Sequence, residues 1–259
     1  LDGFNLENFI LIPKTHKLIK KFNNTIKLNF DEDLLVRGWS KVLAGENAFY
    51  LNAFYNRPKL DGTFQRTSSV NSKSYNGKSI IEYSLDKSKI GIFSFPTLLP
   101  INNANGFLFG APGGGIDPNS KVPVSGVCPE TIHPKFNNKS IWEVRSSSLG
   151  TTNQNDLFNI LINDVKSSIE IFLNLVETNQ NYSFYAIMFR CFDTLNGQFI
   201  SELENKSIND VTNLNLRNCL EKIDDLFSDF ISKLNPSTLI FTTDHGTTKY
   251  KGNINFNKI

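Results

Sequence analysis

The second half of the chain alternates helical patterns with apolar runs, and this order constrains the fold more than any other feature. Apolar residues recur at three- and four-residue spacing over residues 155–176 and 216–234, which predicts two helices that each bury one face. Residues 182–192 and 238–243 are short runs rich in aromatic and β-branched residues, and they predict buried strands. This order favours an α/β fold with a mostly parallel sheet and helices on both faces.

The first half of the chain carries weaker signals. Its expected elements are, in chain order, a helix within 7–22 that begins after Pro13, a strand at 25–30, a helix at 38–49 broken at Gly45, and a strand at 90–95 that stops at Pro96. Residues 57–78 are polar and residues 96–135 are rich in Pro, Gly and Asn, so both are expected to be loops. We expect a single domain over 1–259, with 96–140 as a loop-rich insertion that acts as a lid.

Composition places the chain among ordinary globular proteins and gives little information about partners. It is 39% hydrophobic and 20% charged, with a formal net charge of +2. No nucleic-acid-binding motif is present, no apolar run reaches the roughly 18 residues of a membrane span, and nothing indicates an oligomeric state. Cys128, Cys191 and Cys219 do not form a disulfide framework, which favours a reducing compartment such as the cytoplasm.

Acidic residues follow the predicted strands at the places where function gathers in a parallel sheet. Functional groups of such sheets lie beyond the carboxyl ends of the strands. That rule selects Asp2 at the start of the chain, Asp193 after the strand at 182–192, and Asp244 with His245 after the strand at 238–243. An Asp-His pair there can bind a cation or cap a helix, and Asp193 can equally be a capping or turn residue.

Several segments together resemble the alkaline-phosphatase superfamily, close to its type I phosphodiesterase/nucleotide pyrophosphatase branch. They span almost the whole chain in matching order and are Leu1-Asp2-Gly3, Gly38-Trp39 with Ala44-Gly45, the run 90–96 followed by Pro100 and residues 105–107, and the strand-like run 239–246 that ends in Asp-His-Gly. The resemblance implies an upstream strand and a C-terminal part of the family fold that this chain lacks.

The resemblance also implies a site with two divalent metal ions, usually zinc. Asp2, Asp244 and His245 match the ligands of one ion and Asp193 matches a ligand of the other. Asn56 matches an amide that holds a phosphoryl oxygen, although an Asn before Arg57-Pro58 is also a normal turn residue. Arg37 can contact phosphate as a bidentate cation or lie on the exposed surface.

The chain departs from the family at the positions that perform the chemistry. Leu35 occupies the nucleophile position, where the family has Thr or Ser, and Ser40 replaces it only if the loop register slips. Gly197 lies where a second-metal His is expected, and no His follows His245. We therefore expect a metal-dependent phosphoric-ester hydrolase with weak activity on a small phosphate ester. The alternative is a catalytically degenerate domain that serves as a binding or structural module.

Overall fold

The computed structural model describes residues 1–22, 35–46, 48–51, 76–85, 87–95, 98, 104–110, 126–132, 153–204, 206–244 and 246. In this part of the chain four strands form one sheet in the order β3-β2-β1-β4. Its strands are β1 (Ile90–Phe95), β2 (Gly106–Gly110), β3 (Val127–Cys128) and β4 (Phe184–Ile187). β1 pairs in parallel with β2 and β4, whereas β2 and β3 are antiparallel. The α/β class is confirmed, and the sheet is small and mixed.

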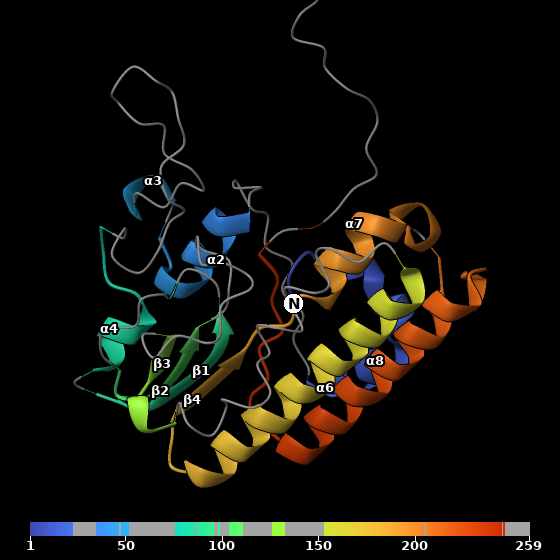
Figure 1. Cartoon of the computed structure of the whole chain (residues 1–259). Helices are drawn as coiled ribbons and strands as arrows, with labels where there is room; N and C mark the ends of the chain where they lie inside the picture. The colour runs from blue at the N-terminus through green and yellow to red at the C-terminus, as the bar shows by residue number, and fades with distance from the viewer. Residues whose placement is uncertain are drawn as a thin grey trace, which may run out of the picture.

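In Figure 1, α6 and α8 lie side by side, and α2 and α4 also contact each other. The helical elements are η1 (Leu6–Leu11), α1 (Pro13–Ile19), α2 (Leu35–Ala44), α3 (Ala48–Leu51), α4 (Ile80–Ser84), α6 (Gln154–Thr178), α7 (Cys191–Leu203), η5 (Ile208–Asp210) and α8 (Leu214–Leu234). The helices predicted at 155–176 and 216–234 are confirmed as α6 and α8. Among the described residues, no helix is long and apolar enough to cross a membrane.

Alternation along β1 divides the apolar interior into two clusters. Phe93 belongs to the cluster that contains Phe172 of α6 and Phe227 of α8, whereas Ile92 belongs to the one that contains Trp39 of α2. Side chains of successive strand residues point to opposite faces, so a fully apolar strand serves both clusters. All six residues of β1 are buried, which confirms the strand predicted at 90–95.

Three expectations about strands and loops are wrong. The stretch 96–135, expected to be a loop, contains β2 and β3. The apolar residues of β2 lie between two glycines, and this composition suggested a loop. The strand expected at 182–192 ends at Ile187, and helix α7 begins at Cys191. Residues 238–243 form neither a strand nor a buried segment; Ile240 is 73% exposed. This segment accepts hydrogen bonds from Leu1 and Phe4, and the Phe241 ring packs against Phe4 and Phe9.

The expected breaks in the first half are confirmed where the structure describes them. Pro13 is the first residue of α1, where its missing N–H is not needed. α2 ends at Ala44, before Gly45, and α3 follows it. The strand expected at 25–30 and the loop at 57–75 lie outside the described residues.

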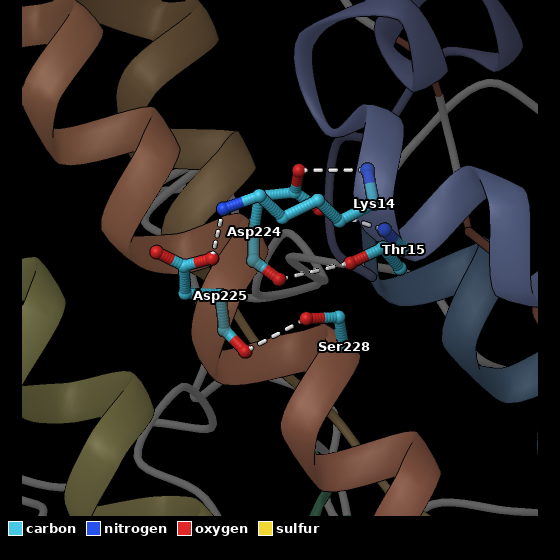
Figure 2. A network of polar contacts seen from close by, with 5 residues as sticks. All are labelled: Lys14, Thr15, Asp224, Asp225 and Ser228. Carbon is cyan, nitrogen blue, oxygen red and sulfur yellow. Dashed lines mark hydrogen bonds and ion pairs between the residues drawn. The ribbon is translucent and has the colours of Figure 1, made fainter.

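A buried carboxylate joins α1 to α8 (Figure 2). Asp224 is 2% exposed, and its oxygens accept the backbone N–H groups of Lys14 and Thr15 at 2.9 and 2.8 Å. Thr15 Oγ1 donates in return to the Asp224 carbonyl at 3.2 Å, and the Lys14 ammonium pairs with Asp225. N–H groups in the first turn of a helix lack partners within it, so Asp224 serves as a cap supplied by another helix.

Candidate functional site

The first residues of the chain lie between the end of β4 and the segment that precedes Asp244. The Asp2 N–H donates to the Phe189 carbonyl at 2.9 Å, and the Leu1 nitrogen donates to the Thr242 carbonyl at 2.6 Å. These bonds place Asp2 just past the carboxyl end of a parallel strand, which is where the site was expected.

Gly3 brings the other two acidic residues to Asp2. A Cβ added to Gly3 would lie 2.8 Å from Asp193 Cα, and Gly3 has a φ of +64°, so both space and backbone conformation favour glycine here. The Gly3 N–H lies 3.5 Å from Asp244 Oδ1. The structure therefore brings together Asp2, Asp193 and Asp244, which come from three distant parts of the sequence.

Arg190 and Trp39 compensate part of this negative charge. Arg190 Nε is 3.5 Å from Asp2 Oδ2, and Arg190 Nη2 is 3.6 Å from Asp193 Oδ2. Trp39 Nε1 donates to Asp2 Oδ1 at 3.4 Å. Asp2 and Asp244 are 1% and 0% exposed, and neighbouring buried carboxylates repel each other unless a positive charge or a proton relieves them.

The first turn of α2 packs directly on the cluster. A Cβ added to Gly38 would lie 2.4 Å from the Asp244 carbonyl oxygen, so only glycine permits this approach. Leu35 begins α2 three residues earlier, about one helical turn away. The position expected for the nucleophile thus belongs to the turn that lies at the cluster. Ser40 is fully buried inside α2, so a slipped register that exposes its hydroxyl does not occur.

Helix α7 holds Asp193 in its first turn. A carboxylate in this position interacts favourably with the positive end of the helix dipole. This agrees with the interpretation of Asp193 as a capping residue. Asn196, one turn further along α7 and fully buried, donates through Nδ2 to the Gly3 carbonyl at 2.8 Å and to Asn8 Oδ1 at 3.2 Å. Asn196 thereby fixes the loop that carries Asp2.

The remaining predicted site residues lie outside the described part of the chain. These are Asn56, His245 and the side chains of Leu35 and Arg37, so their roles stay predictions. Gly197 lies within α7 and carries no ligand, as expected from the sequence.

The metal-binding capacity of this cluster depends on its carboxylate oxygens. Among the described residues, no three His, Cys, Asp or Glu side chains form a group that could hold a metal ion. Asp2 and Asp244 are nonetheless hard oxygen donors in a buried place, and His245 directly follows Asp244 in the chain. Asp2 Oδ1 lies 3.4 Å from Trp39 Nε1, and Asp244 Oδ1 lies 3.5 Å from the Gly3 nitrogen. Asp193 has the Arg190 guanidinium beside it instead.

Comparisons with known proteins give one result. No family model, curated protein or solved structure matches this chain. Membership of the alkaline-phosphatase superfamily therefore stays a prediction that rests on the motifs.

Sequence reasoning missed three residues of this site: Arg190, Trp39 as a donor, and Asn196. Arg190 lies three residues before Asp193, a spacing that lets two side chains meet on a helix, and this signal was available. Asn196 and the indole N–H act on residues 193 and 37 positions away in sequence, and no local spacing announces such contacts.

Proposed function

We propose that this chain is a phosphoric-ester hydrolase, of phosphodiesterase or phosphatase type, that works with a divalent cation. The convergence of Asp2, Asp193 and Asp244 beyond the carboxyl end of β4 is the observation that carries the proposal. A fold uses such positions for ligands and chemistry, and three clustered carboxylates destabilise a protein that gains nothing from them. The proposal includes the family assignment, with β1, β2 and β4 as the parallel part of an alkaline-phosphatase-like sheet.

The residues divide the work in the following way. Asp2, Asp244 and His245 would hold the cation, for which zinc is the first choice among ions that take oxygen and nitrogen ligands. A cation bound there would polarise a phosphoryl oxygen and lower the pKa of a coordinated water. The first turn of α2, which packs on Asp244 through Gly38, would border the site, and Asn56 would donate its amide to a phosphoryl oxygen. Water would supply the oxygen that attacks phosphorus, because leucine has no group that can do so, and the ester alcohol would leave.

A matched pair of variants tests this proposal. The metal-stripped chain, with Zn²⁺ or Mn²⁺ added back, is assayed on bis(4-nitrophenyl) phosphate and 4-nitrophenyl phosphate. We expect slow, cation-dependent turnover that falls at least about tenfold in Asp244→Ala and is unchanged in Asp225→Ala, an exposed acid on α8. Turnover that persists undiminished in Asp244→Ala would place the chemistry elsewhere.

The second candidate is a degenerate domain that binds a ligand without turnover. The burial of Ser40 favours this second candidate. Ser40 directly follows Trp39 and is the alternative nucleophile, and its hydroxyl is inaccessible to a substrate. Elemental mass spectrometry separates the two candidates: a bound cation with no turnover indicates the degenerate domain. In that case Leu35→Thr is expected to restore hydrolysis only together with a second cation site, since nucleophile and metals act as a unit.

A further inference from the structure

We infer that Arg190 provides the second positive charge of the site, so that the site takes one divalent cation and binds the phosphoryl group partly through a guanidinium. This inference rests on the proposed function and deepens it. It also marks a disagreement between the structure and the two-ion site that the resemblance implies, because the residues around Asp193 do not fit a second cation.

The position of Arg190 is the first step. Its Nε lies 3.5 Å from Asp2 Oδ2 and its Nη2 lies 3.6 Å from Asp193 Oδ2, so one planar group faces both carboxylates. A guanidinium stays charged at any physiological pH. A metal ion bound to Asp193 would have to lie a few ångströms from this charge or displace it, and like charges at that distance disfavour each other.

Crowding of the backbone at residue 197 is not what removes a ligand. A Cβ added at Gly197 would meet no heavy atom within 4 Å, so open space surrounds the start of a side chain there. The second site is therefore missing for two chemical reasons, the absent ligand at 197 and the guanidinium beside Asp193.

Arg190 remains able to bind an anion. Its side chain is 26% exposed, which connects it to solvent. A guanidinium has five N–H groups, and the two ion pairs engage only Nε and one Nη. The rest of the fork matches the geometry of two phosphoryl oxygens. The ligand class is thus a phosphate monoester or diester, or inorganic phosphate.

Counting bound cations tests the first half of the inference. Native mass spectrometry of the full chain with Mn²⁺ is expected to show one ion in the wild type and one in Gly197→His. The double variant Arg190→Ala with Gly197→His is expected to bind two. Two ions in the wild type, or in Gly197→His alone, would overturn the inference.

Phosphate affinity tests the second half. The affinity for inorganic phosphate is measured by calorimetric titration at saturating Mn²⁺. We expect it to fall about tenfold or more in Arg190→Gln, because one strong charge-assisted contact is lost, and to fall less in Arg190→Lys. Arg217→Gln is the matched control, because Arg217 bonds the carbonyls of Val211 and Asn209 instead. An Arg190→Gln variant that melts earlier but binds phosphate as tightly as wild type would show a purely structural role.

Failure of the proposed function gives a different result from failure of this inference. If the wild type binds no cation, the hydrolase proposal and the single-cation part of this inference fail together, and thermal melting still tests whether the Arg190 guanidinium occupies the place of an ion. The double variant Arg190→Ala with Gly197→His is then expected to melt at a higher temperature when Mn²⁺ is added, because the ion replaces the guanidinium. No change with Mn²⁺ would contradict the inference.

Discussion

Two buried carboxylates of this chain, Asp224 and Asp2, are held in different ways. Asp224 accepts two backbone N–H groups at 2.9 and 2.8 Å, within the range of good hydrogen bonds. Asp2 meets the Trp39 indole and the Arg190 guanidinium at 3.4 and 3.5 Å, both side chains and both long. Each carboxylate is almost fully buried, so burial alone does not separate a structural acid from a functional one.

The difference teaches what to look for in a buried acid. At Asp224 the charge is satisfied by two backbone N–H groups in the first turn of α1. These groups are held rigidly and have no acceptor within their own helix. At Asp2 the Trp39 and Arg190 side chains approach the carboxylate at longer distances, and two further acidic residues come together beside it. A buried acid that lies among other acidic residues is a better candidate for ligand binding than one that caps a helix.

The largest effect is expected from removing the Asp224 cap. Asp224→Ala should lower the free energy of unfolding by about 3 kcal/mol, because two N–H groups of α1 lose a charged acceptor inside the protein. Chemical denaturation followed by circular dichroism measures this. Asp225→Ala, which removes only the exposed pair with Lys14, should leave the midpoint unchanged. Equal losses in the two variants would end the distinction between cap and surface pair.

A smaller effect is expected at Trp39. Trp39→Phe keeps an aromatic ring against Phe95, whose ring now lies 5.1 Å away, but removes the donor to Asp2. We expect a loss of about 1–2 kcal/mol from one hydrogen bond and some packing. The loss should shrink when Asp2→Asn is also present, and a double-mutant cycle measures this coupling. Additive losses would show that the long indole contact contributes nothing.

Asp244→Asn is expected to change stability by less than about 1 kcal/mol without added cation, because it relieves repulsion while it weakens one long contact. With Mn²⁺ present, the wild type should gain stability and the variant should not. Melting curves with and without the ion check both statements. A loss as large as that of Asp224→Ala would mean that Asp244 is held as a structural acid.

The smallest effect is expected on the reactivity of the buried thiols. Cys219 reports on the packing around α8, which carries Asp224, and Cys191 reports on the packing around the acidic cluster. Burial raises the pKa of Cys219 on α8 to about 12 and raises that of Cys191, at the start of α7, well above its usual value. Both should react with a thiol reagent at pH 8 only after unfolding, since the thiolate is the nucleophile. A Cys191 that reacts before Cys219 would show that the region around the acidic cluster opens first.

The raised pKa values of these two thiols also predict that the stability of the fold decreases at alkaline pH. Because the folded-state pKa of Cys219 lies above the ordinary thiol value of 9.0, the unfolded chain loses its proton first. The stabilisation is complete below about pH 9 and is lost as pH rises toward 12. Comparing the alkaline melting curves of wild type and Cys219→Ala measures this contribution.

Periodicity predicted the parts of the fold that depend on local pattern. Helices α6 and α8 and strand β1 follow from apolar spacing and from the proline that ends the run. Strand β2 was not predicted, because its residues Phe107 and Phe109 lie in a stretch whose Gly and Asn content suggested a loop. Residues 238–243 are apolar enough for a buried strand, yet burial depends on what packs against them in the assembled fold, which no local pattern reveals.

The acidic residues of the candidate site were selected because they follow predicted strands or begin the chain, whereas their partners were not found. Asp193 and Asp244 each follow an apolar run, although neither run is a strand up to that point in the structure, and Asp2 was selected at the start of the chain. The contact between Arg190 and Asp2 joins residues 188 positions apart, and the approach of Gly38 to Asp244 depends on how α2 docks. Such contacts follow from the assembled fold.

The bonds of the first four residues have a consequence for the order of folding. Gly3 and Phe4 donate to Asp244 and Thr243, across 241 and 239 positions of sequence. Contacts this distant close a very large loop and form slowly, while α6 and α8 can form from neighbouring residues. The helical layer can therefore assemble while the acidic cluster is still open, and the cluster closes only when the two distant segments meet.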